Sequence, residues 1–289
     1  MLVKPPHNEH ELELAIVRRA GRSNRQALID RTVLANGIVG QLLGEGAGVK
    51  GGSGLKFRYG SANCRYTMDF DTTRSIDLDA FIKGFRARLK AGWNGFTGEV
   101  DILEAHAPRG VPLDYVMQPL KVRLRYRNQT WCSVDLEITL GSAGSAEQLE
   151  IVPPNAETIA LFTDLGLEVP GPVRLMSLEH QVAQKLRGVS GPGSRRAHDL
   201  IDLQLILARE DLNLARIGKI CTDIFRGYGS VAWPPNIRKG ENWDALYSEQ
   251  LADLPVLATV DEAIAWANDI VAKIEHERQQ AFGGKSNDN

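Results

Sequence analysis

The chain is 289 residues long, with 43% hydrophobic residues, 24% charged residues and a formal net charge of −2. Its length predicts two domains, or one large body with an appendage, and its composition excludes a disordered protein. The small net charge excludes a uniformly basic protein, so any contact with nucleic acid has to come from a local patch.

Cysteine usage and the first residues indicate the compartment. Cys64, Cys132 and Cys221 form no pair at metal-ligand spacing and no disulfide framework, as is usual in a reducing environment. Residues 1–7 lack the apolar core of a signal peptide, and no run approaches the 18 apolar residues of a membrane span. We therefore expect a cytoplasmic protein without a membrane partner.

Residues 9–43 have the apolar spacing of helices, and Gly21 interrupts the pattern, which predicts two helices. The glycine-rich stretch 44–54 is expected to end the second helix as a loop.

The stretch that follows is the most informative part of the chain. Gly51 and Gly52 predict a tight turn, and Ser53 is expected to begin a helix with its hydroxyl facing unpaired N–H groups. Backbone N–H groups at such a turn form a nest that suits a phosphate.

Asp69, Phe70 and Asp71 come soon after this turn. On a strand, alternation places both acids on one face and sends Phe70 to the core. Paired carboxylates near a phosphate nest suit divalent-metal-assisted chemistry on a nucleotide. The alternative is a glycine turn beside a strand with a solvated acidic face.

A second Asp-x-Asp pair, Asp77 and Asp79, competes for the role of metal site. It leads directly into an amphipathic pattern, where acids cap a helix and complement its dipole. We therefore prefer Asp69 and Asp71.

Two alternating segments follow and predict a hairpin, with a turn at Asn128 and Gln129. The first carries a row of cations on one face: Lys121, Arg123, Arg125 and Arg127. The second, 131–138, carries Asp135 and Glu137 on one face, which offers a third acid if this strand lies beside the first acidic strand. Charged faces are also common on solvated edge strands.

The rest of the chain is expected to be a linker or surface loop at 141–155 and then mostly helices. Ser177 is placed to cap a helix in which Lys185 sits beside the apolar face. Ser194 is placed to cap the next helix, in which Asp199 and Asp202 share a face. Without a functional role, Lys185 would be a snorkelling lysine and the two acids a helix-start charge pair.

These pieces together resemble the AbiEii-type nucleotidyltransferase toxins, including the MenT toxins, of the polymerase-β-like nucleotidyltransferase superfamily. The matching positions are Gly51-Gly52-Ser53, then Arg65, Thr67, Asp69, Phe70 and Asp71, then Asp135 or Glu137, then Leu178-Glu179 with Lys185, then Arg196, Asp199 and Asp202. The chain departs from the family pattern at Gly54, where alanine is usual, and the third acid is ambiguous.

The resemblance implies an α+β fold. It implies a mixed sheet with flanking helices in a nucleotidyltransferase-like domain over 1–152, and a mostly helical domain over 153–289 that contributes to the cleft.

The resemblance also implies an enzyme of a type IV toxin–antitoxin or abortive-infection system. It would transfer a nucleoside monophosphate from an NTP to an RNA acceptor, the 3′ end of tRNA, and a cognate antitoxin would neutralise it. Alternatives are a nucleotidyltransferase that modifies a protein or small molecule, and a non-catalytic relative that binds a nucleotide or partner.

The implied roles follow the motif positions. Mg²⁺ would be held by Asp69 and Asp71, with Asp135 as a further metal ligand or Glu137 as a further catalytic acid. The nucleotide would be bound by Gly52, Ser53, Thr67 and Lys185. Asp199 or Asp202 would orient Lys185 or act near the attacking hydroxyl.

Overall fold

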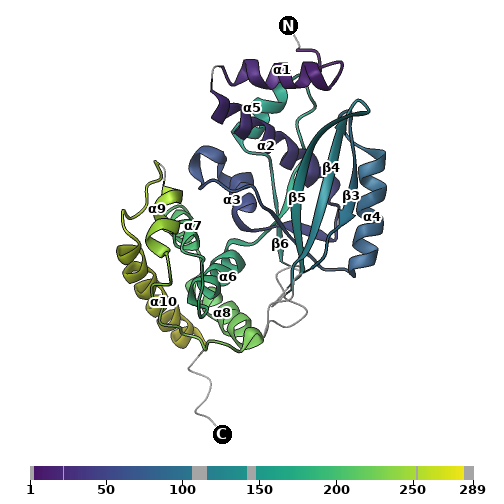
Figure 1. Cartoon of the computed structure of the whole chain (residues 1–289). Coiled ribbons are helices and arrows are strands. Elements are labelled where there is room, and N and C mark those ends of the chain that lie inside the picture. Colours follow the sequence, from purple (N-terminus) through teal and green to yellow (C-terminus); the bar gives the residue numbers. More distant parts are fainter. Residues whose placement is uncertain (1–2, 22, 106–115, 142–147, 252, 283–289) are drawn as a thin grey trace. The chain divides into compact units, whose positions relative to one another are not determined.

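The computed structural model describes residues 3–21, 23–105, 116–141, 148–251 and 253–282 (Figure 1). The chain divides into two compact units, Met1–Met176 and Ser177–Asn289, which we call the N-terminal and C-terminal units. Strands are confined to the first, and the described part of the second is helical. The predicted α+β class is confirmed.

The two predicted N-terminal helices are present. Helix α1 spans Glu9–Arg19 and α2 spans Asn24–Leu42. Each begins at a side-chain cap, because the Asn8 and Ser23 side chains accept N–H groups of the first turn.

Seven strands of the described chain form one mixed sheet in the order β3-β4-β5-β2-β1-β7-β6. The β2–β5 and β1–β7 pairs are parallel and the other neighbours are antiparallel. The strands are β1 Ala47–Val49, β2 Phe70–Arg74, β3 Phe96–Ile102, β4 Gln118–Tyr126, β5 Gln129–Leu140, β6 Leu149–Val152 and β7 Val173–Met176.

The two faces of the sheet differ in burial, as strand β4 illustrates. Leu120, Val122 and Leu124 are buried, whereas Lys121 is half-buried and Arg123 is exposed. Helix α4 (Leu78–Ala91) lies along the strands β3 to β5 in Figure 1 and packs its apolar stripe against the buried face. The opposite face carries the charged residues and is called the charged face below.

The hairpin of β4 and β5 is present, with its turn one residue earlier than predicted. Arg127 and Asn128 have positive φ values of 48° and 69°, as in the turns that match the twist of paired strands. The prediction that Arg127 lies on the strand with the other cations is therefore wrong, because this residue forms the turn.

Three short strands were not predicted. Strand β1 lies inside the stretch 44–54 that was expected to be a loop, and β6 lies inside the expected linker 141–155, of which 142–147 are outside the described residues. Strand β7 lies in the part of the chain that was expected to be mostly helices. Because β6 and β7 extend the sheet, the compact units divide after Met176. The domain boundary expected after residue 152 stays a prediction.

Helix α3 (Gly51–Tyr59), followed by the short 3-10 helix η1 (Ser61–Asn63), and helix α5 (Ala156–Asp164) complete the N-terminal unit. The prediction that Ser53 caps α3 is wrong. The helix begins two residues earlier, with Lys50 at the cap position and no side-chain cap, because Ser53 is buried inside the first turn.

The C-terminal unit consists of α6 Leu178–Ser190, α7 His198–Leu207, α8 Leu214–Tyr228, α9 Trp243–Leu251 and α10 Val260–Phe282. Ser177 caps α6 as predicted. Ser194 does not cap α7, because the Ser194 hydroxyl accepts from the Arg196 N–H ahead of the helix. Across the described residues, no helix is both long and apolar enough to cross a membrane.

Candidate active site

The two acidic strands lie side by side on the charged face. In the parallel β2–β5 pair, Asp71 is the register partner of Glu137, and Phe70 is the partner of Leu136. Phe70 and Leu136 are buried, so alternation directs both carboxylates to the other face. Neighbouring strands are about 4.8 Å apart, which brings two acids together from residues 66 positions apart in the sequence.

Asp69 lies one residue before β2 and is exposed. Asp71 is half-buried. The two predicted metal-binding acids thus flank the buried Phe70, as alternation requires, although only Asp71 belongs to the strand.

The N-terminus of α3 lies against Asp71. Gly51 has a φ of +62°, and a Cβ on Gly51 would overlap the Asp71 carboxylate. Glycine is therefore required here both for the left-handed backbone and for the close approach. The first N–H groups of a helix lack intrahelical acceptors and attract anions, so α3 offers a phosphate nest beside this acid.

Lys50 adds a cation that was not predicted to belong to the site. Its backbone N–H donates to the Asp71 carbonyl at 2.9 Å, and its ammonium donates to the Thr139 hydroxyl at 2.9 Å. Thr139 lies two residues after Glu137 on β5, so Lys50 reaches the strand that carries the acid. Its position next to the glycine pair was the available signal.

Ser53 and Lys56 of α3 hold the segment that leads to Asp69. The Ser53 hydroxyl donates to the Asp69 carbonyl at 2.6 Å, and the Lys56 ammonium donates to the Thr67 carbonyl at 2.6 Å. The Thr67 hydroxyl accepts the Asp69 N–H at 3.3 Å. We call Ser53 and Lys56 the α3 clamp. Lys56 was not predicted to belong to the site, although its spacing of three from Ser53 places both residues on one helix face.

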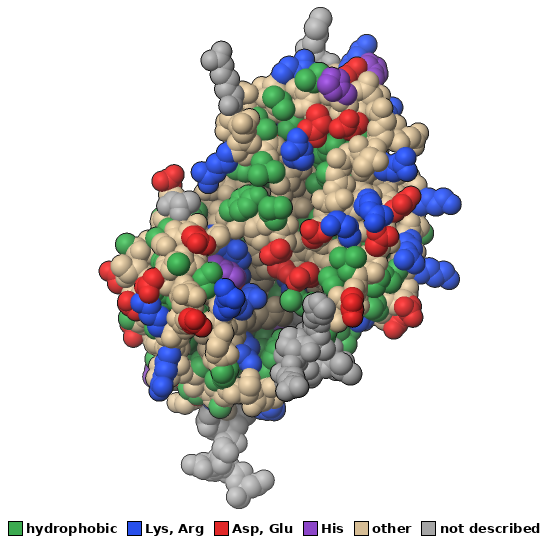
Figure 2. All heavy atoms as spheres, viewed as in Figure 1, with side chains coloured by type: hydrophobic (Ala, Val, Ile, Leu, Met, Phe, Trp, Pro, Cys, Tyr) green, Lys and Arg blue, Asp and Glu red, His purple; other side chains and the backbone are tan. Residues whose placement is uncertain are grey.

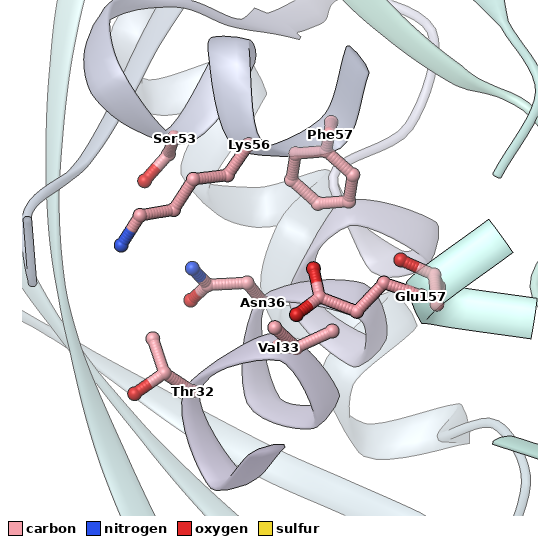
Figure 3. Close-up of a pocket in the computed structure, with 8 residues that line it drawn as sticks. Thr32, Val33, Asn36, Ser53, Lys56, Phe57 and Glu157 are labelled. Atoms are coloured by element: carbon pink, nitrogen blue, oxygen red, sulfur yellow. The ribbon is translucent and has the colours of Figure 1, made fainter. Parts of the chain in front are cut away.

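Figure 3 shows the small pocket beside the α3 clamp, formed by α2, α3 and α5. The side chains of Ser53 and Lys56 extend in the same direction, and the Asn36 amide lies beneath the lysine ammonium. The cavity volume available to water is about 20 Å³, which is enough for about one water molecule. The pocket is therefore too small for a nucleotide.

The predicted cations of β4 also lie on the charged face, and two of them are paired. Lys121 lies 3.2 Å from Asp135, and Arg123 forms an ion pair with Asp101. Figure 2 shows basic and acidic side chains interspersed over this sheet. Asp135 therefore faces a cation of β4, whereas Glu137 is the acid that lies beside Asp71.

Lys185, Asp199 and Asp202 form a buried cluster in the C-terminal unit. The Lys185 ammonium donates to Asp199 at 3.0 Å and to Asp202 at 2.6 Å. The three side chains are 4%, 0% and 0% exposed. Burying charges is costly without close pairing, and α6 and α7 bring one cation between two acids.

Asp199 is held as a carboxylate. Burial alone would raise the pKa of Asp199, but the charges of Arg196, Lys185 and His198 hold this pKa well below its ordinary range. The cluster thus fixes the Lys185 ammonium in one place, between two carboxylates.

The carboxylates of the charged face fit a hard divalent cation. Mg²⁺ in nucleotide sites is usually held by one or two carboxylates together with substrate phosphates and water, and Asp71 and Glu137 supply such a pair. The described residues contain no group of three or more His, Cys, Asp or Glu side chains gathered for a metal ion. The N-terminal unit thus offers a pair of carboxylates, suited to a metal ion, beside a phosphate nest.

Comparison with known proteins gives the family. A model of the family described as nucleotidyl transferase AbiEii toxin, type IV TA system, matches residues 32–269. A comparison with curated proteins finds no match.

Solved structures with a similar fold include MenT4, a nucleotidyltransferase toxin from Mycobacterium tuberculosis, which is 17% identical with a TM-score of 0.50. That match covers 92% of this chain and 97% of MenT4. JHP933 from Helicobacter pylori is 15% identical with a TM-score of 0.46, over 91% of this chain and 97% of that one. Because the family model covers most of its length, the chain belongs to the AbiEii family of nucleotidyltransferase toxins of type IV toxin–antitoxin systems.

Proposed function

We propose that this protein transfers a nucleoside monophosphate from an NTP to the 3′ hydroxyl of an RNA acceptor, the 3′ end of tRNA, and so blocks translation in the cytoplasm. Family membership supports the transferase class and the toxin role. The observation that carries the proposal is the register pair of Asp71 and Glu137 beside the N-terminus of α3.

The proposed nucleotide site uses backbone donors and carboxylates of the N-terminal unit. The N–H groups of Gly52 and Ser53 donate hydrogen bonds to phosphate oxygens of the NTP. Asp69 and Asp71 would hold Mg²⁺, with Glu137 next to Asp71, and the bound ion would neutralise the charge of the triphosphate and polarise its oxygens. In this arrangement Thr67 serves the nucleotide indirectly, because its hydroxyl orients the backbone of Asp69.

Lys185 supplies a fixed positive charge to the triphosphate and its leaving group. Ammonium groups act as point charges toward phosphates, and Asp199 and Asp202 hold this one in place. The acids of the cluster are therefore positioning residues in the proposal.

The proposed reaction balances as a single displacement. The acceptor oxygen forms a bond to the α-phosphorus, the bond from this phosphorus to the bridging oxygen breaks, and pyrophosphate leaves with the electron pair. The proton of the acceptor hydroxyl passes to a carboxylate. Glu137, which lies beside Asp71, is the proposed general base.

The cations of β4 are the proposed contact for the acceptor backbone. Lys121, Arg123 and Arg125 are on the charged face or at its edge, and phosphate contacts from such residues supply affinity that falls with salt. A cognate antitoxin is the expected protein partner, as the family implies.

A second candidate is transfer to a protein or small molecule. The pairing of Lys121 with Asp135 and of Arg123 with Asp101 favours it, because ion pairs within the face leave less charge for a polyanion. This reading keeps the nucleotide site and changes only the acceptor.

The acceptor decides between the two candidates. Purified protein is incubated with each labelled NTP and Mg²⁺, in parallel with total RNA and with RNase-treated extract. We expect label in small RNA at its 3′ end, and none when EDTA replaces Mg²⁺. Label only in the RNase-treated extract would establish the second candidate, and no label in any arm would refute both.

A further inference from the structure

Two large apolar side chains are exposed immediately before Asp69. Tyr66 is 41% exposed and Met68 is 63% exposed, while Thr67 between them is 8% exposed. This alternation places Tyr66 and Met68 on the outer side of the extended segment that leads to β2. Scattered apolar side chains on a surface need no explanation, but these two lie directly next to a proposed metal-binding acid.

The segment that carries this pair is held in place. The α3 clamp fixes the carbonyls of Thr67 and Asp69, and the Lys56 ammonium lies over the Tyr66 ring, 5.2 Å from its centroid. A flat side chain on a backbone that is already fixed loses little conformational entropy when a ligand stacks on it. The Tyr66 ring therefore offers a preorganised surface, with the adaptable Met68 side chain two residues away on the same side of the segment.

The contacts of α3 give this surface a direction relative to the phosphate nest. The first residue of α3, Gly51, lies against Asp71, whereas Lys56, further along the helix, contacts Tyr66 and Thr67. Asp69 lies between these two ends in the chain. If a nucleotide binds at the nest, Tyr66 and Met68 therefore lie on the opposite side of Asp69 from it. Three residues of extended chain separate Tyr66 from Asp69, a distance of about 10 Å.

We propose that Tyr66 and Met68 form a stacking platform for the terminal base of the unpaired RNA end that receives the nucleotide. Unstacked bases at single-stranded ends stack on aromatic side chains, with affinity that depends little on the base. The platform places the 3′-terminal nucleotide next to Asp69. This inference rests on the proposed function, because it names how the acceptor of that reaction is held.

The test measures binding without NTP, so that it does not depend on catalysis. The probe is a 5′-fluorescein-labelled single-stranded oligoribonucleotide whose last nucleotide either carries a base or is abasic, and the Kd is measured by fluorescence anisotropy. We expect wild-type protein to bind the abasic probe about 5- to 150-fold more weakly, as stacking on one aromatic side chain implies.

Variants assign this effect to the platform. Tyr66→Ala and Met68→Ala are expected to bind both probes with nearly equal Kd, and Tyr66→Phe to keep the preference for the intact base. Leu14→Ala and Ile151→Ala are matched controls, because these side chains are 45% and 69% exposed in the same unit. Thermal unfolding confirms that each variant is folded.

Three results would overturn the inference. These are no binding of the probe by the wild type, an equal preference for the base in wild type and Tyr66→Ala, and a raised KM for NTP in Tyr66→Ala without a change in RNA binding. The last would assign the platform to the base of the NTP. If Tyr66→Ala removes the preference but wild type transfers no label to RNA, the platform stands and the proposed function fails.

Discussion

Glu137 and Asp135 lie two residues apart on one face of β5, yet they have different neighbours. Asp135 is exposed and forms an ion pair with Lys121 on β4. Glu137 is half-buried and lies beside Asp71 on β2. The strand order thus separates two acids that sequence spacing leaves equivalent.

Replacement of these acids tests the assignment. Glu137→Gln is expected to lower kcat/KM for nucleotide transfer by about 10²-fold or more, because loss of a carboxylate at a metal site costs several kcal/mol. Asp135→Asn, the matched control, is expected to stay within a few-fold of wild type. A larger loss of kcat/KM for Asp135→Asn than for Glu137→Gln in a steady-state transfer assay would identify Asp135 as the third acid of the site.

The cluster of Lys185, Asp199 and Asp202 predicts a pH dependence of stability. The pKa of Asp199 is lower in the folded protein than the ordinary value of a carboxyl group. Its contribution is therefore fully present above the ordinary pKa, and it is lost as the pH falls below about 4 toward the folded value. We expect the free energy of unfolding of the C-terminal unit to decrease over this range.

Asp199→Asn removes the titrating group and is expected to give a flatter pH profile between about pH 4 and pH 2, even if its stability at pH 7 is lower. Urea unfolding at several pH values, followed by far-UV circular dichroism, measures both quantities. Equal slopes in the variant and the wild type would show that Asp199 is not the group responsible.

Helix α3 contacts both Asp71 and the segment that leads to Asp69. Its first residue touches Asp71, and its Ser53 and Lys56 hold the backbone before Asp69. The position of the two acids relative to the phosphate nest therefore depends on one short helix.

Gly51→Ala tests this dependence, and Gly21→Ala is its control. Both glycines have positive φ, +62° and +66°, but a Cβ on Gly21 would meet nothing within 4 Å. Both variants are expected to lose about 1 kcal/mol of stability from backbone strain. Only Gly51→Ala should displace the Asp71 carboxylate and lower the transfer rate by about tenfold or more. Similar activity of the two variants would contradict the close approach of α3 to Asp71.

Helices that begin at a capping residue could be predicted from the sequence. The shared helix face of Asp199 and Asp202 could also be predicted, because it follows from helical spacing. Ser177 marked the start of α6, and the spacing of Asp199 and Asp202 placed both on the face that meets Lys185. The short strands β1, β6 and β7 were missed because three or four residues are too few to carry an alternation signal.

Two features of the site depended on long-range structure. The choice of Glu137 over Asp135 required the parallel register of β2 and β5, which no local pattern encodes. Ser53 was expected at the cap of α3, but its hydroxyl is used by the Asp69 carbonyl. Local propensity was overruled there by a contact between segments 16 residues apart.

For the molecule as a whole, the net charge of −2 leaves RNA binding to local patches. The cations of β4 are the candidate patch in the N-terminal unit, although Lys121 and Arg123 also have acidic neighbours. Salt dependence separates a patch that contacts phosphates from one that only balances charge.

The double variant Arg123→Gln/Arg125→Gln is expected to raise the KM for the RNA acceptor and to leave the KM for NTP nearly unchanged. The slope of log Kd against log salt should fall by about 0.7 to 0.9 for each phosphate contact removed. Arg18→Gln/Arg25→Gln, which removes two exposed arginines of α1 and α2, is the matched control. An unaltered slope in the first variant would show that β4 is a solvated face.

The most direct test of the proposed active site is label transfer by Asp69→Ala compared with Asp79→Ala. Both acids are exposed in the N-terminal unit, and Asp79 lies in the first turn of α4, where it belongs to the rival acidic pair. Purified proteins with matching thermal unfolding curves are incubated with labelled NTP, Mg²⁺ and RNA, and initial rates of incorporation are measured. The proposed site predicts a loss of about 10²-fold or more in the rate for Asp69→Ala and a near-normal rate for Asp79→Ala. A near-normal rate for folded Asp69→Ala would contradict the site.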